Sequence, residues 1–144
     1  MAERPTVVFT WARRPVRGTA AELRRVAHHV LEKLGVETGE VGVLVSSDAA
    51  IHSLNRSFRG VDRPTDVLAF PAGESQPDGP PYLGDIAISL DTARRQAAAA
   101  GVAEIQELAT LLVHGLLHLH GFDHERDGGE MMALEMSLRR ELGL

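Results

Sequence analysis

The hydrophobic positions along the chain alternate between a strand-like and a helix-like period. Short apolar runs, with valines at every second position from Val41 to Val45, predict strands at residues 6–9, 41–45, 66–70 and 83–89. Apolar residues spaced three or four apart predict a helix after each of the first two strands and three more after the last. This order predicts one α/β (α+β) domain over residues 1–144, with a roughly four-stranded mixed sheet packed against several helices.

Polar residues at the starts of these segments predict where the helices begin. Thr19 followed by Glu22 forms a capping box, and Asp48 is expected to cap the second helix. The proline-rich stretch at 71–81 is too short to separate two cores and is expected to be a loop. The second helix is expected to carry Ile51, Leu54, Asn55 and Phe58 on one face and to end near Gly60.

Composition narrows the chemistry. The 144 residues are 44% hydrophobic and 24% charged, as in ordinary globular domains, and contain no cysteine, so histidines and carboxylates are the candidate metal ligands. The net charge of -5 argues against blanket binding to nucleic acid but is compatible with a local basic site. Neither a signal peptide nor an apolar stretch of about 20 residues is evident, so we expect a cytoplasmic protein without a membrane partner.

Four of the seven histidines lie between His114 and His124. On a helix, His114 and His118 project from the same face one turn apart, and after Gly121 breaks the helix, His124 can approach from a loop. Three histidines leave the fourth position of a tetrahedral zinc open, which is the pattern of catalytic sites. The spacing predicts one Zn²⁺ per chain, and Asp123 is expected to support the site by accepting a ring N–H from a ligand histidine.

The same spacing matches the metzincin peptidase pattern H-E-x-x-H-x-x-G-x-x-H at every position but one. Gly115 stands where the metzincin glutamate acts as general base, which disfavours a peptidase. Two alternatives remain open on the residues alone. A zinc hydrolase of peptides or other small substrates predicts a carboxylate close to the metal, and a non-enzymatic ribosome-associated protein predicts a metal that only holds the helix and loop together.

Three blocks of the sequence resemble the YbeY family of bacterial endoribonucleases. The segment HGLLHLHGFDH at 114–124 resembles the family signature H-G-x-L-H-L-x-G-[YF]-D-H. The segment LNRSFRGVDRPTDVLAFP at 54–71 resembles the block L-N-x-x-[YF]-R-x-x-x-[KR]-P-T-[DN]-V-L-S-F-P, with Ala69 in place of the usual serine. The third block, LGDI at 83–86, resembles the family's L-G-D-I strand.

The resemblance implies a zinc-dependent endoribonuclease that prefers single-stranded RNA. It further implies a role in 3′ end maturation of small-subunit rRNA and in ribosome quality control, with the ribosome or small-subunit proteins as partners. The three histidines would be the zinc ligands and Arg59 a functional residue. A guanidinium can stabilise the negative charge that builds on phosphate oxygens during cleavage, so Arg59 is expected to be catalytic. Arg56 and Arg63 are candidate RNA-backbone contacts. The general base, and whether water or the 2′-hydroxyl attacks, stay open.

Overall fold

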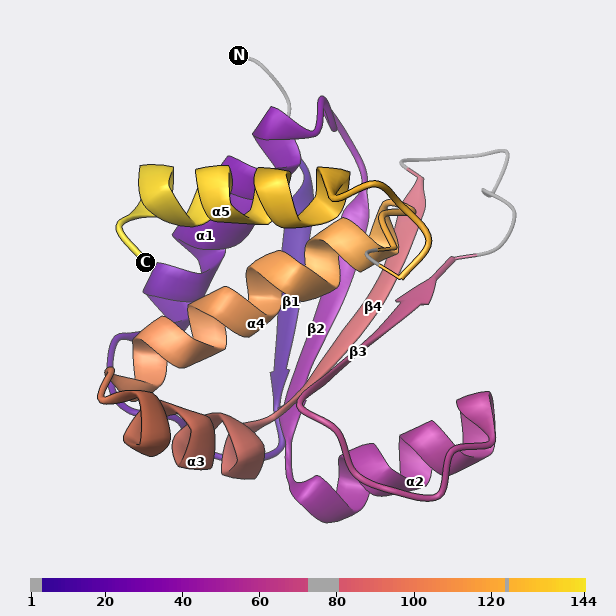
Figure 1. The fold of residues 1–144 in the computed structure, drawn as a ribbon, viewed down its shortest axis with the longest axis vertical. Helices are drawn as coiled ribbons and strands as arrows, with labels where there is room; N and C mark the ends of the chain where they lie inside the picture. Colours follow the sequence, from indigo (N-terminus) through magenta and orange to yellow (C-terminus); the bar gives the residue numbers. More distant parts are fainter. Residues whose placement is uncertain (1–3, 73–80, 124) are drawn as a thin grey trace.

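The computed structural model describes residues 4–72, 81–123 and 125–144. Within these ranges strands alternate with helices up to the third strand, and three consecutive helices follow the last strand (Figure 1). In chain order, the elements are β1 (Thr6–Trp11), α1 (Thr19–Lys33), β2 (Glu40–Ser46), α2 (Asp48–Arg59), β3 (Val67–Pro71), β4 (Tyr82–Ser89), α3 (Leu90–Ala100), α4 (Glu104–Leu119) and α5 (Glu130–Leu142).

The four described strands form one mixed sheet in the order β1-β2-β4-β3. β1, β2 and β4 run parallel to one another, and β3 pairs antiparallel with β4. β3 is therefore an edge strand, although it precedes β4 in the sequence. This arrangement confirms the predicted α+β domain with a four-stranded mixed sheet.

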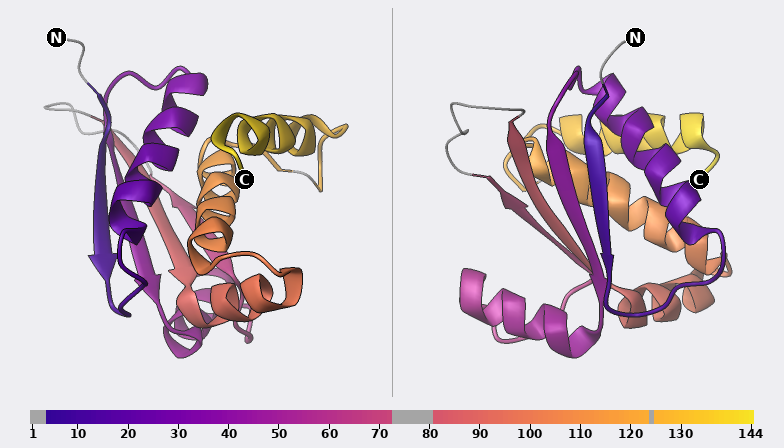
Figure 2. Two further views of the ribbon diagram at one scale, coloured as in Figure 1. Left: turned by 90° about the vertical axis from the view of Figure 1, so that its left-hand side faces the viewer. Right: turned by 180° about the vertical axis from the view of Figure 1, so that it is seen from behind.

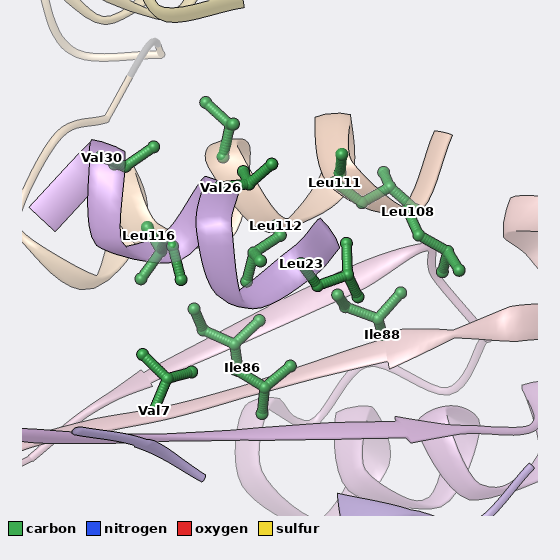
Figure 3. Packing of buried hydrophobic residues seen from close by; sticks show 14 of the residues in the cluster. Val7, Leu23, Val26, Val30, Ile86, Ile88, Leu108, Leu111, Leu112 and Leu116 are labelled. Atoms are coloured by element: carbon green, nitrogen blue, oxygen red, sulfur yellow. The ribbon is translucent and has the colours of Figure 1, made fainter. Parts of the chain in front are cut away.

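The helices lie on both faces of the sheet, but unequally. α1, α4 and α5 gather on one face, as the side view in Figure 2 shows, and residues of α3 join the same core. In Figure 3, Ile86 and Ile88 of β4 point towards the leucines of α4 and the valines of α1. Ala87, between them, faces the opposite side and packs in a smaller core with Ile51 of α2. The alternation along β4 thus assigns α2 to the second face.

α4 is buried on most of its circumference because β3 and β4 cover one side while α1, α3 and α5 cover others. Gly115 is the point of closest approach to the sheet. A Cβ atom at this position would lie 2.9 Å from Ile86 Cγ2 and 3.1 Å from Val67 Cγ2, closer than carbon atoms pack. The helix therefore needs a glycine here.

Two predicted helix caps are off by one residue. The N-cap of α1 is Gly18, in a left-handed conformation, while Thr19 is the first helical residue and its hydroxyl donates to the Val16 carbonyl at 2.6 Å. The N-cap of α2 is Ser47, whose hydroxyl oxygen accepts a helix N–H at 3.2 Å. Asp48 instead takes part in side-chain hydrogen bonds with the start of α3.

The predicted face of α2 is buried along only part of its length. Ile51 and Asn55 are buried and Leu54 is half-buried, but Phe58 is 70% exposed. The reason is visible in Figure 1, where the last turn of α2 projects away from the strands. Helical spacing predicts which residues share a face of the helix. It does not predict how far along the helix the sheet covers that face.

None of the helices in the described residues is by itself long and apolar enough to cross a membrane. α3 and α4 together reach that length and composition, but the two helices are bent by 115° relative to each other.

Candidate metal centre and the opposite sheet face

α4 brings two histidine rings together. His114 Nε2 and His118 Nε2 lie 3.0 Å apart, and the ring centroids are separated by 4.6 Å. Two nitrogens bound to one tetrahedral zinc at about 2.0–2.1 Å lie roughly 3.3 Å apart. The separation in the structure is close to that value, so the two rings fit a shared metal ion without a change of helix geometry.

Glu135 of α5 holds the outer nitrogen of His114. Its two carboxylate oxygens lie 3.2 and 3.4 Å from His114 Nδ1, and both side chains are mostly buried. This hydrogen bond raises the pKa of His114, and burial opposes the rise. Because Nδ1 donates its proton to the carboxylate, the neutral ring keeps its lone pair on Nε2, which faces His118. A carboxylate in this position orients a metal-ligating histidine and increases its basicity.

The sequence analysis missed Glu135. The sequence does contain a signal for this residue, because Glu135 is a carboxylate among core positions of the helix. It falls at helical spacing with Met131, Leu138 and Leu142, which are all buried. A charged residue in such a row is uncommon unless it has a partner inside the protein. Glu135 has such a partner in His114.

The third predicted ligand, His124, lies outside the described residues. Among the residues that are described, the structure contains no group of three histidines or carboxylates able to hold a metal ion. Asp123 lies in the turn after α4, where its carboxylate accepts the Glu125 N–H at 3.0 Å and pairs with Arg126 at 3.5 Å. The described donors are thus two converging imidazoles and one supporting carboxylate, a set that suits zinc.

The residues around the histidine pair disfavour the peptidase alternative, which requires a carboxylate close to the metal. A glutamate at position 115 would have to enter the space already filled by Ile86 and Val67. Glu135 is a carboxylate near the pair, but it contacts His114 on Nδ1, the nitrogen that faces away from His118. It therefore matches an orienting contact better than a base directed at an attacking water.

Arg59 lies on the other face of the sheet, on the last turn of α2. It lines a cavity of about 730 Å³ whose floor includes Leu44, Phe70 and Ala87. Side chains of β3 and β4 that face this cavity alternate with those that face α4. The structure thus does not bring Arg59 and the histidine pair together, because edge strand β3 lies between them.

Arg56 and Arg63 flank Arg59 in the sequence, and all three are exposed. Gly60, with a φ of 69°, ends α2 and reverses the chain, and the buried Asn55 donates to the Arg63 carbonyl at 2.9 Å. No carboxylate of the described residues forms an ion pair with the three guanidinium groups. Asp62 lies in the same segment, and its pKa is lowered chiefly by a hydrogen bond with His52 and also by the charge of Arg56, so positive charge exceeds negative charge at this end of α2 without being wholly unopposed.

Asp85 lines the same cavity, and its carboxylate accepts a hydrogen bond from the hydroxyl of Tyr82. This contact raises the pKa of Tyr82 to about 12, chiefly through the hydrogen bond. The cavity thus has a cationic end at Arg59 and an acidic side at Asp85.

These features define the class: a single α+β domain with a candidate metal centre on its most buried helix and a separate basic face. Residues 12–143 match the family model described as Endoribonuclease YbeY, and the chain belongs to this family. It is 49% identical to Endoribonuclease YbeY of Chloroflexus aggregans, covering 87% of this chain and 88% of that one. It is 47% identical to the protein of the same name from Thermus thermophilus, covering 80% and 84%.

A solved structure supports the fold independently. The solution structure of TM1509 from Thermotoga maritima is similar with a TM-score of 0.65 and 27% sequence identity. The match covers 95% of this chain and 89% of the other. The family resemblance and the fold class predicted from sequence are both confirmed.

Proposed function

We propose that this chain is a zinc-dependent endoribonuclease that prefers single-stranded RNA. His114, His118 and His124 would hold one zinc ion per chain. The observation that carries the proposal is the 3.0 Å convergence of His114 Nε2 and His118 Nε2, with Glu135 on the outer nitrogen of His114. The shared name of the relatives, Endoribonuclease YbeY, supports RNA as the substrate class.

The proposed setting extends beyond the name of the relatives. We propose that the RNA is small-subunit rRNA, processed at its 3′ end, and that the protein acts in ribosome quality control in the cytoplasm. In that setting the ribosome or small-subunit proteins are its partners. The net charge of -5 supports a local basic contact with RNA in preference to sequence-independent coating of the nucleic acid.

In this proposal the residues on the α4 side of β3 hold the metal, and the residues on the α2 side contact the RNA backbone. Zinc, when bound, supplies Lewis acidity to the scissile phosphate. Glu135 holds the Nδ1 proton of His114 and fixes the direction of the ring. Arg59, with Arg56 and Arg63 beside it, neutralises phosphates of the RNA backbone. Arg59 therefore acts on the bound strand from the opposite face of the sheet.

A preference for unpaired RNA follows from this division. A strand that contacts both the α4 side and the α2 side has to bend around β3, the edge of the sheet. A single strand can bend and splay its bases, whereas an A-form duplex is stiff and presents its bases already paired and stacked. We therefore expect duplex RNA to be cleaved much more slowly.

Cleavage by the purified protein, with its metal content measured, tests the proposal. Single-stranded and duplex RNA are compared for the wild type, His114→Ala and Arg59→Glu. Arg17→Glu is the matched charge reversal, because Arg17 is also exposed but lies before the start of α1, outside the cavity that Arg59 lines. We expect single-strand cleavage that requires His114 and Arg59 but not Arg17, and about one zinc per chain.

Three results would contradict the proposal. Cleavage that survives both His114→Ala and Arg59→Glu undiminished points to a contaminating nuclease. A wild-type protein without a bound transition metal excludes the metal site. A zinc-loaded, folded protein that cleaves no RNA indicates that the metal has only a structural role.

A further inference from the structure

Phe58 carries the most exposed large hydrophobic side chain in the described part of the chain, with 70% of its surface open to solvent. Full burial of such a side chain would stabilise the fold by about 1.5–3 kcal/mol, and this contribution is mostly absent here. The ring is held from one side by Phe70, with centroids 5.4 Å apart and an interplanar angle of 63°. An edge contact of this kind leaves ring surface free for a stacking partner.

The surroundings of Phe58 indicate the chemistry of that partner. Phe58 and Phe70 line the cavity of about 730 Å³ together with apolar side chains of the sheet and α2. Its volume falls within the range of roughly 300–1,000 Å³ typical of small-molecule sites. Arg59 follows Phe58 directly and supplies positive charge, while Asp85 on the strand side repels anions. A flat apolar group therefore fits over the rings, and an anionic group fits only at the Arg59 end.

We infer that this face binds one unpaired RNA nucleotide, with its base stacked on Phe58 and its phosphate on Arg59. The inference rests on the proposed function and names a binding subsite for its substrate. Every base has a π-face, and an aromatic ring next to an arginine is a recurrent way to hold single strands without reading their sequence. The bases of a duplex are already stacked on each other, so the subsite favours single-stranded RNA.

The excess of three guanidinium groups over the single carboxylate of Asp62 at this end of α2 favours a polyanion over a protein helix or a second copy of the chain. A protein partner of the apolar cavity would have to bring compensating carboxylates to Arg56, Arg59 and Arg63. RNA provides a regular series of phosphates next to its bases. Its chemistry matches both the rings and the charges with one molecule.

Binding of a fluorescent single-stranded RNA oligomer, followed by anisotropy with EDTA present so that no cleavage occurs, tests the subsite. Phe58→Ala is expected to weaken binding about 5- to 150-fold, the range for loss of one stacked base. Phe58→Trp is expected to restore it. Met132→Ala is the matched control, because Met132 on α5 is also a highly exposed apolar side chain. An oligomer of abasic nucleotides is expected to bind wild type and Phe58→Ala equally.

Cleavage kinetics give a second readout. Because Phe58 lies across β3 from the histidine pair, Phe58→Ala is expected to raise KM much more than it lowers kcat. Binding of the normal oligomer within twofold of wild type overturns the subsite, as does a wild type that binds no single-stranded RNA. A change from dimer to monomer in Phe58→Ala without loss of RNA affinity overturns it in favour of self-association.

The two proposals fail in different ways. If the wild type cleaves RNA and Phe58→Ala binds it normally, the proposed function stands and the subsite falls. If RNA binding depends on Phe58 but the zinc-loaded protein cleaves nothing, the subsite stands and the endoribonuclease proposal falls. Urea unfolding of Phe58→Ala confirms that the variant is folded, as expected for a side chain with so little buried surface.

Discussion

Substitution of Gly115 by alanine is expected to destabilise the protein, although alanine is the better helix former. In an open helical position the exchange stabilises by about 1 kcal/mol. At Gly115 the new Cβ would lie 2.9 Å from Ile86 Cγ2 and 3.1 Å from Val67 Cγ2, against an ordinary carbon contact of about 3.5–4.0 Å. Overpacking of a core costs about 1–3 kcal/mol. Because Ile86 is fully buried and has little room to move, we expect a cost in the upper part of this range, about 2–3 kcal/mol. Subtracting the propensity gain of about 1 kcal/mol leaves a net loss of about 1–2 kcal/mol.

Urea unfolding of the metal-free protein measures this loss. EDTA is needed because zinc bound to the native state alone would add its own binding free energy to the apparent stability. Ala98→Gly in α3 is the matched control, since Ala98 is an exposed helical residue. It is expected to lose about 0.5–1 kcal/mol through helix propensity alone.

The signs of the two changes in the free energy of unfolding show whether α4 has space for a side chain at position 115. If α4 packs against the sheet as described, Gly115→Ala and Ala98→Gly both lower the free energy of unfolding, although they are opposite exchanges. A gain of stability in Gly115→Ala would show that the helix has space at this position. The packing explanation for the missing metzincin glutamate would then be refuted.

Three further predictions concern polar contacts. Glu135→Gln is expected to lower zinc affinity about 10- to 100-fold in competition with a chromogenic chelator, because His114 loses its charged partner, and unchanged affinity would exclude an orienting role. Tyr82 is the chain's single tyrosine, so tyrosinate absorbance reports it alone. We expect its pKa to lie well above 10.0, at about 12, and to return towards 10.0 in Asp85→Asn. Stability linked to this raised pKa is present below pH 10 and is lost as the pH rises towards 12; a titration midpoint near 10 in the wild type would contradict the hydrogen bond. Asp48→Asn is expected to cost about 1 kcal/mol near neutral pH. The difference should shrink as the pH falls through the pKa of Asp48, which its hydrogen bonds hold below the ordinary 3.8, and a difference independent of pH would argue against it.

Local patterns in the sequence predict the elements of this fold well. The valines of β2 alternate as expected, and the four predicted strands form the predicted mixed sheet. The errors lie where a tertiary neighbour overrides the local pattern. Asp48 is a good capping residue, but its carboxylate is engaged by the Ser89 and Thr92 hydroxyls, each at 2.6 Å, and Ser47 caps the helix instead.

The candidate site was predictable only where its residues lie on one element of secondary structure. The convergence of His114 and His118 follows from helical spacing alone, since both rings are on one helix. Glu135 is 21 residues further along and meets His114 only because α5 folds back on α4. The position of Arg59 depends on which face of the sheet α2 covers. The apolar run at 86–88 indicates that both faces of β4 are covered but not by which helix.

The separation of Arg59 from the histidine pair changes how the family resemblance is understood for this chain. The sequence leads to the expectation that Arg59 is a catalytic group alongside the histidine site. The structure instead has the histidine pair and Glu135 on α4 and α5 and a basic, aromatic face on α2, with the edge strand β3 between them. Under the proposed function, an arginine there would stabilise the bound strand at a neighbouring nucleotide. Substitutions on the α2 face should therefore act mainly on RNA binding, and substitutions around His114 mainly on metal binding and turnover.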